Sequence, residues 1–182
     1  MLISGLPGTG KSTLARMLAR RYALPLICKD TIKEPLFDVI GAADRVESRR
    51  LSDASFAAMF ALARDCLRAG ADLILEGNFR PGEHEAALVT AGSGDARVAQ
   101  ILCCASEPVR IARLKARATD LSRHPGHRDA SFVQDPAPAR NEFLELPGLR
   151  LVLDGDGLSA VDTHDPRVLE LLDALDHWRR EA

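Results

Sequence analysis

The segment Gly5–Ser12, with the sequence G-L-P-G-T-G-K-S, restricts the fold of this chain more than any other stretch. It matches the pattern G-x-x-x-x-G-K-[ST] at every fixed position. Glycines let the backbone curl, so that several N–H groups point inward as an anion nest. The apolar pair Leu2-Ile3 precedes the segment, and apolar residues at helical spacing follow it. A strand, a phosphate-binding loop and a helix are therefore predicted in this order. The alternative is a Gly-rich turn that binds nothing.

The residues of this loop have distinct predicted roles. Lys11 is expected to reach the β- and γ-phosphates of a nucleotide and to act in catalysis, and the Ser12 hydroxyl is expected to bind Mg²⁺. The N-terminus of the following helix adds its dipole. The predicted nucleotide-binding residues are Gly5, Leu6, Pro7, Gly8, Thr9, Gly10, Lys11, Ser12 and Thr13.

Composition and charge narrow the class of protein. The 182 residues are 46% hydrophobic and 27% charged, which is typical of one globular domain spanning 1–182. A net charge of −2 gives no overall basic field to attract nucleic acid. The four cysteines have no C-x-x-C spacing, which favours reduced thiols in a cytoplasmic protein. No signal peptide or apolar run of membrane-spanning length is found, so no membrane partner is expected. No obligate protein partner is evident either.

Apolar strand-like runs alternate with helical ones, which predicts an α/β fold with a parallel sheet. Strands are predicted at 2–4, 25–28, 72–76, 97–104 and 149–153. Helices are predicted at 11–22, 31–40, 52–69, 83–91, 107–118, 137–146 and 166–180. Thr31 and Glu34 have the spacing of a capping box, and Gly70 is expected to end the third helix.

Two acidic residues follow predicted strands. Asp30 comes just after the second strand, and the carboxyl ends of parallel strands share one edge of a sheet. It is therefore expected near Lys11, as a base for a substrate hydroxyl, as a magnesium ligand, or only as a helix cap. Glu76 ends the third strand and is expected to hold a polar substrate group or a metal-bound water. A solvated strand end remains the alternative for Glu76. Arg80, just beyond, is expected to contact an anionic group, with an ordinary surface arginine as the alternative.

Arginines are concentrated in the helix predicted at 107–118 and just beyond it. Arg110, Arg113 and Arg117 share one helical face, and Arg123 follows in a polar segment rich in Pro and Gly. Arginines that swing in from a lid stabilise the charge of a transferring phosphoryl group. A lid at about 113–130 is therefore predicted, with an ordinary solvated helix face as the alternative.

Four motifs in this order resemble one family. They are Gly5–Ser12, 29–34 (K-D-T-I-K-E), 75–80 (L-E-G-N-F-R) and 123–127 (R-H-P-G-H). Together they are similar to the small bacterial P-loop kinases of the AAA-33 or predicted-kinase group, relatives of polynucleotide 5′-kinase, chloramphenicol phosphotransferase and the zeta toxins. The resemblance covers nearly the whole chain.

The resemblance implies a three-layer fold with a five-stranded parallel sheet in the order 2-3-1-4-5, and transfer of the γ-phosphate of ATP, with Mg²⁺, to a hydroxyl. It implies that Asp30 is the general base, that Ser12 and Asp30 bind the metal, and that Lys11 contacts phosphate. Arg113 and Arg117 would match catalytic lid arginines, and Glu76 and Arg80 a substrate-side pair. Beside the resemblance, Arg123 is also expected to be catalytic, and Asn78 to face the substrate.

The acceptor is expected to be a small molecule with a hydroxyl group. The third strand ends in Glu76-Gly77-Asn78, where polynucleotide kinase has an Asp-containing motif, and no aromatic platform for bases is evident. A nucleic-acid acceptor is therefore disfavoured. A toxin-like nucleotide-sugar kinase and a polynucleotide 5′-hydroxyl kinase remain alternatives. From another class, a regulatory module that binds ATP without transferring phosphate also remains open.

Overall fold

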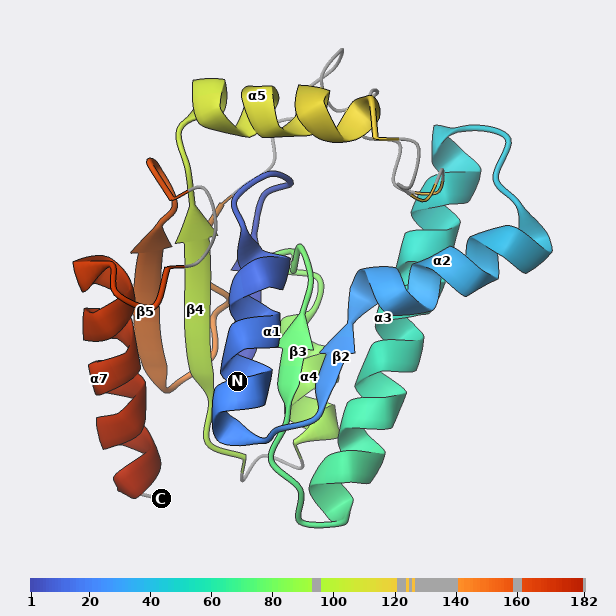
Figure 1. The fold of residues 1–182 in the computed structure, drawn as a ribbon. Coiled ribbons are helices and arrows are strands. Elements are labelled where there is room, and N and C mark those ends of the chain that lie inside the picture. Colours follow the sequence, from blue (N-terminus) through green and yellow to red (C-terminus); the bar gives the residue numbers. More distant parts are fainter. Residues whose placement is uncertain (93–95, 121–123, 125, 127–140, 159–161, 182) are drawn as a thin grey trace.

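A computed structural model describes residues 1–92, 96–120, 124, 126, 141–158 and 162–181. Its centre is a sheet of five parallel strands in the order β2-β3-β1-β4-β5. In Figure 1, β2 and β3 lie on one side of α1, and β4 and β5 lie on the other. The strands are β1 Leu2–Gly5, β2 Leu26–Cys28, β3 Ile74–Glu76, β4 Ala99–Cys104 and β5 Leu149–Asp154. The described helices are α1 Lys11–Tyr22, α2 Lys29–Ile40, α3 Arg45–Arg68, α4 Glu85–Ala91, α5 Glu107–Ala118 and α7 Pro166–Arg180. The predicted three-layer α/β fold and strand order are confirmed.

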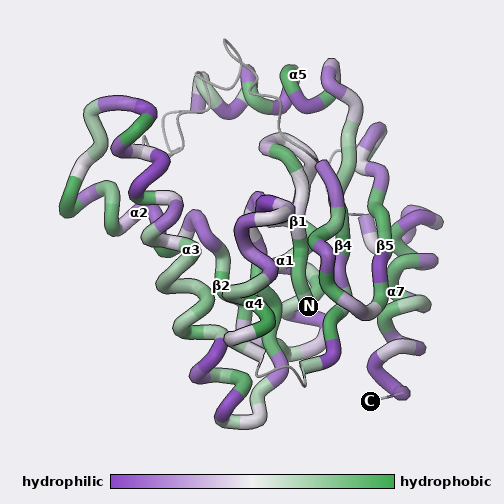
Figure 2. Tube along the Cα trace, turned by 180° about the vertical axis from the view of Figure 1, so that it is seen from behind, coloured by the Kyte–Doolittle hydropathy of each residue, from purple (hydrophilic) through white to green (hydrophobic). Residues whose placement is uncertain are grey.

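Two apolar clusters, one on each face of the sheet, hold the layers together. On one face α1 and α7 bury residues such as Leu18 and Leu175 against β1 and β4. On the other face α3 and the segment before β5 bury residues such as Met59 and Leu144. In Figure 2 the stretch around β1 is mostly hydrophobic, whereas α5 alternates between hydrophilic and hydrophobic residues. A strand covered on both faces needs such a continuous apolar run.

Strand register brings the ends of the strands to one edge of the sheet. Glu76 pairs with Cys28 of β2 and with Ile3 of β1, while Gly5 pairs with Cys103 of β4. The phosphate loop, the start of α2 and the segment after β3 therefore leave the sheet at this edge. Helix α5 crosses above it (Figure 1). This is the edge at which open α/β sheets bind ligands.

Three helix starts differ from the prediction. Helix α4 begins at Glu85, two residues later than expected. Helix α2 begins at Lys29, directly after β2, so Thr31 lies inside the helix and the predicted capping box at Thr31 is wrong. Helix α3 begins at Arg45, seven residues earlier than expected, because the Asp44 side chain accepts a hydrogen bond from the Glu47 N–H at 2.9 Å. Gly70 follows α3 in the left-handed conformation, with a φ of 77°, as predicted.

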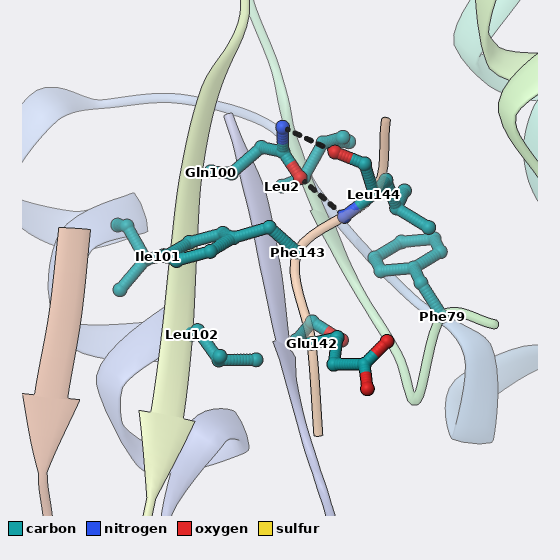
Figure 3. Close-up of a pocket in the computed structure, with 9 residues that line it drawn as sticks. Leu2, Phe79, Gln100, Ile101, Leu102, Glu142, Phe143 and Leu144 are labelled. Atoms are coloured by element: carbon teal, nitrogen blue, oxygen red, sulfur yellow. Dashed lines mark hydrogen bonds between the residues drawn. The ribbon is translucent and has the colours of Figure 1, made fainter. Parts of the chain in front are cut away.

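The helix predicted at 137–146 is wrong where the structure describes it. Residues 141–146 are not helical, and 137–140 lie outside the described residues. Figure 3 shows that this segment lies beside β4, where the Gln100 amide bonds both backbone groups of Leu144, at 3.0 and 3.2 Å. A buried glutamine amide thus replaces the hydrogen bonds that a helix would have made within itself.

Candidate functional site

The phosphate loop connects β1 to α1 through a tight turn. Gly8 and Gly10 have φ values of 87° and 95°, which side chains with a Cβ rarely adopt. The Thr9 hydroxyl donates to the Leu6 carbonyl at 2.9 Å and closes the turn from inside. Gly10 is the N-cap of α1, so Lys11 and Ser12 occupy the first helical turn. The loop therefore has a defined shape and ends at a helix N-terminus, as an anion site requires.

Glu76 lies at the centre of the edge, beside Lys11. The Lys11 ammonium is 3.9 Å from a Glu76 carboxylate oxygen, and the Glu76 side chain is only 3% exposed. Burial raises the pKa of the Cys28 thiol to about 12, and the neighbouring Glu76 carboxylate adds to the shift. Cys28 is therefore a neutral thiol and adds no charge beside Glu76. The charged neighbour of Glu76 described here is the Lys11 ammonium. A solvated strand end is not what the structure shows for Glu76.

Asp30 lies in the first turn of α2, next to the segment after β3. Its carboxylate is 2.6 Å from the Lys29 ammonium, and its side chain is 34% exposed. A Cβ at Gly77 would lie 3.4 Å from the Lys29 Cβ, so the start of α2 touches the end of β3. The structure thus brings Asp30 to the same edge as Lys11 and Glu76. If the Asp30 carboxylate accepts a proton, it does so while one of its oxygens is paired with the Lys29 ammonium.

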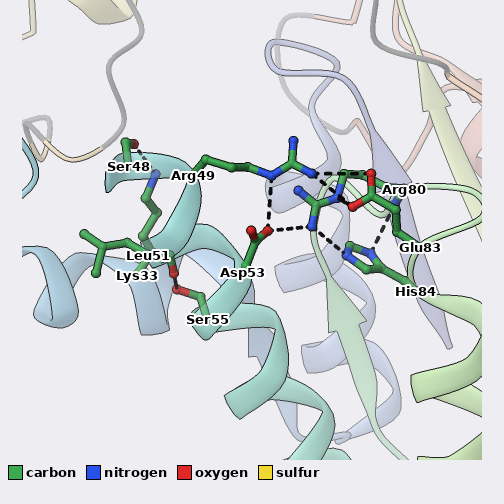
Figure 4. A network of polar contacts seen from close by, with 9 residues as sticks. All are labelled: Lys33, Ser48, Arg49, Leu51, Asp53, Ser55, Arg80, Glu83 and His84. Carbon is green, nitrogen blue, oxygen red and sulfur yellow. Dashed lines mark hydrogen bonds and ion pairs between the residues drawn. The ribbon is translucent and has the colours of Figure 1, made fainter. Parts of the chain in front are cut away.

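Arg80 does not point freely toward a ligand. Figure 4 shows its guanidinium bonded to Asp53 of α3 at 2.7 Å and paired with Glu83 at 2.8 Å. Its backbone N–H donates to Nδ1 of His84 at 3.1 Å, and the guanidinium lies over the Phe56 ring. Burial and the Arg80 charge lower the pKa of His84 to about 4, so the imidazole is neutral. This network fixes the loop after β3, which also contains the half-buried Asn78.

The predicted lid arginines have different surroundings. Arg113 donates to the backbone carbonyls of Gly8, at 3.0 Å, and Gly155, at 2.7 Å, and also to that of Leu158. Arg117 is half-buried one turn further along α5. Arg123 lies outside the described residues, as does most of the predicted lid beyond residue 120. Sequence reasoning did not anticipate that Arg113 would bind the phosphate loop itself.

Two contacts of α2 side chains were not predicted from the sequence. The Lys33 side chain is buried, and its ammonium donates to the Ser48 hydroxyl of α3 at 2.9 Å. His124 lies 2.9 Å from the Asp38 carboxylate and packs edge-on against Phe37. The second contact joins the predicted lid segment to α2. Neither pair has a sequence spacing that identifies it, because each joins segments distant in the chain.

The residues available for a metal fit Mg²⁺. The Ser12 hydroxyl and the Asp30 and Glu76 carboxylates are hard oxygen donors, which this ion prefers, and it usually keeps few protein ligands. Within the described ranges, no three or more His, Cys, Asp or Glu side chains cluster as a metal site. Assignment of the metal to Ser12 and Asp30 therefore stays a prediction.

One cavity lies away from the phosphate loop. It has a volume of about 260 Å³ and is lined by residues such as Met1, Leu88 and Trp178, mostly apolar. These surround the amino ends of the central strands, and none of the lining residues belongs to the phosphate loop. The chemistry described above is therefore not in this cavity. None of the described helices is long and apolar enough to span a membrane.

Known proteins resemble the chain in sequence and in fold. Uncharacterized proteins of Mycobacterium tuberculosis (strain ATCC 25618 / H37Rv) and Mycobacterium bovis are 30% identical over 98% of the chain, which spans 34% of their length. A crystal structure from Chloroflexus aurantiacus, called a "putative kinase", is 30% identical with a TM-score of 0.79, over 99% of this chain and 95% of that one.

Two more distant structures share the fold alone. A sugar kinase from Janibacter sp. HTCC2649 has a TM-score of 0.63 at 15% identity, over 96% of this chain and 92% of that one. A gluconokinase from Sinorhizobium meliloti 1021 has a TM-score of 0.51 at 15% identity, over 100% and 91%. The profile of the AAA_33 family, described as an AAA domain, matches residues 1–134. The chain therefore belongs to the AAA_33 family of P-loop domains.

Proposed function

We propose that this protein is an ATP-dependent kinase that transfers the γ-phosphate to a hydroxyl group of a small molecule. The observation that supports this most is that Lys11 of the phosphate loop lies at the same carboxyl edge of the sheet as Glu76 and Asp30. A cation and two carboxylates beside a phosphate-binding loop are what phosphoryl transfer to a hydroxyl requires. The similar structures named as kinases support the same reaction class.

In this proposal Lys11 binds the β- and γ-phosphates and is held toward them by Glu76. The carboxylate of Asp30 accepts the proton of the acceptor hydroxyl as the phosphoryl group is transferred. Ser12 and Asp30 hold Mg²⁺, which when bound neutralises part of the phosphate charge. Glu76 and Asn78 face the acceptor, and Arg80 shapes its site by fixing the loop after β3. Arg117 and Arg123 contact the transferring phosphate from a lid, and residues 1–182 form one kinase domain.

A small-molecule acceptor is supported by the sugar kinase and the gluconokinase that share the fold. A sugar, a sugar acid, a nucleoside or a hydroxyl-bearing antibiotic supplies the needed alcohol, and a screen over these classes identifies the acceptor. ATP that binds without transfer to any of them supports a regulatory ATP-binding module instead.

The test of catalysis uses Lys11→Ala. The variant is expected to fold and to lose measurable phosphotransfer, because no other cation in the loop can take the place of the Lys11 ammonium. Lys115→Ala, an exposed lysine on α5, serves as the matched control and is expected to keep full activity. Undiminished transfer by a folded Lys11→Ala protein contradicts the proposal.

A further inference from the structure

Two arginines of α5 bind the outside of the phosphate loop. The Arg110 Nε–H donates to the Pro7 carbonyl at 3.0 Å, and the Arg113 guanidinium donates to the Gly8 carbonyl at 3.0 Å. These carbonyls belong to two successive peptide units at the tip of the loop. Because a trans peptide is planar, its C=O and N–H point in opposite directions. Fixing the Pro7 and Gly8 carbonyls toward α5 therefore turns the Gly8 and Thr9 N–H groups away from α5.

The loop and α5 are also in close contact through their backbones. A Cβ at Gly8 would lie 3.0 Å from the Arg110 carbonyl oxygen and 3.2 Å from its Cα. Glycine at this position lets the helix approach closely enough for both arginines to reach the loop. The contact is therefore built from both sides, by a residue without a side chain in the loop and by two long cationic side chains in the helix.

Arg113 ties the loop to a third segment, which follows β5. The same guanidinium donates to the Gly155 carbonyl at 2.7 Å and to the Leu158 carbonyl. The planar fork of an arginine can serve several acceptors at fixed angles, which a lysine ammonium does less well. This segment is itself fixed, because the Asp156 carboxylate accepts from the Ser106 N–H at 2.8 Å at the start of α5. Arg113 is thus the junction of the phosphate loop, α5 and the β5 end.

We propose that Arg110 and Arg113 are positioning residues that hold the phosphate loop in its nucleotide-binding shape before the nucleotide binds. Three carbonyls already accept hydrogen bonds from the Arg113 guanidinium, so in this arrangement it holds the loop rather than reaching the γ-phosphate. Any lid motion then begins after Leu114, which is buried, and excludes the anchored first turns of α5. The inference rests on the proposed function only in that the loop binds a nucleotide.

The test measures ADP affinity by calorimetry and the hydrogen exchange of the loop amides without nucleotide. Arg113→Ala is expected to weaken ADP binding at least about tenfold, equal to about 1.4 kcal/mol, and to speed exchange in 6–10. Arg110→Ala should do the same to a smaller extent, because it removes one bond. In both variants, the turnover number at saturating ATP should change less than about threefold. The control Lys115→Ala should keep the wild-type ADP affinity, loop exchange and turnover number.

A second variant protects the test against misfolding. Arg113→Lys keeps the charge, but its ammonium cannot reproduce the three-carbonyl geometry, so its ADP affinity is expected between those of wild type and Arg113→Ala. An ADP affinity unchanged in both variants overturns the proposal. If Arg113→Ala keeps the ADP affinity but lowers the turnover number more than tenfold, the proposal is also overturned. Arg113 would then stabilise the transition state instead of positioning the loop. If no acceptor is ever phosphorylated, the proposed function fails, but the exchange measurement still decides this inference.

Discussion

Gly5, at the junction of β1 and the phosphate loop, allows a sharp test of how tightly this edge is built. Its φ is 149°, and a Cβ there would lie 2.4 Å from the carbonyl oxygen of Cys103, its partner on β4. It would also lie 2.8 Å from the Thr9 hydroxyl oxygen that closes the loop. Neither the β4 backbone nor the closed turn can move without breaking the contacts described above.

The expected loss for Gly5→Ala has two parts. A left-handed conformation costs a residue with a Cβ about 1–2 kcal/mol. Inserting a methyl group into a packed site costs a further ~1–3 kcal/mol, so the free energy of unfolding should fall by about 2–5 kcal/mol. For a chain of this length, each kcal/mol lowers the Tm by roughly 2–4 °C. Urea denaturation and thermal unfolding measure the two quantities.

Gly70→Ala is the matched control for this prediction. Gly70 has a φ of 77°, but a Cβ there would meet nothing within 4 Å, so only the conformational cost applies. Gly70→Ala should therefore lose only about 1–2 kcal/mol. If Gly5→Ala is no less stable than Gly70→Ala, the close approach of β1 to β4 at Gly5 is not as described and the reasoning is refuted.

Three further predictions concern the site. Asp30→Asn should lower the turnover number by roughly 10²–10⁴-fold with ATP affinity preserved; a loss of stability with unchanged turnover would make Asp30 only structural. The pKa of His84 is about 4 in the folded protein and 6.5 ordinarily, so His84 gains a proton on unfolding between these pH values. Its contribution to the free energy of unfolding should therefore fall by on the order of 2–3 kcal/mol as the pH drops through this range, and stay constant above it. In His84→Gln this pH dependence should shrink; an equal slope in both proteins would contradict it. An ATP analogue should slow hydrogen exchange after Leu114 but leave 107–114 equally protected in both states, and equal exchange throughout would exclude a nucleotide-driven lid.

The parts of the fold predicted correctly from sequence are those set by local patterns. The phosphate loop follows from its own eight residues, and the meeting of Asp30 and Glu76 at one edge follows from parallel strands. The start of α3 could have been found, since Asp44 and Glu47 have the spacing of a helix cap, but the apolar periodicity begins only later. The conformation of 141–146 could not be predicted from local sequence, because its backbone is bonded by Gln100, a residue distant in the chain.

The orientation of the site arginines was beyond sequence reasoning. Nothing in the spacing of α5 distinguishes Arg113 from Arg117, because the difference lies in backbone carbonyls of segments far along the chain. Arg80 illustrates the same limit, since its partner Asp53 comes from a different helix. An arginine near a phosphate loop identifies the neighbourhood of the chemistry, but its partners decide whether it touches the ligand.

The bonds from Arg110 and Arg113 to the phosphate loop join residues 103 and 105 positions apart. During synthesis on the ribosome, the loop therefore emerges long before the residues that fix it. Arg113 also needs Gly155 and Leu158, which lie beyond the family match at 1–134. Because domains fold as units, a nascent chain that ends before β5 should leave the loop mobile. Competence to bind nucleotide should then arrive late in synthesis, with the last strand.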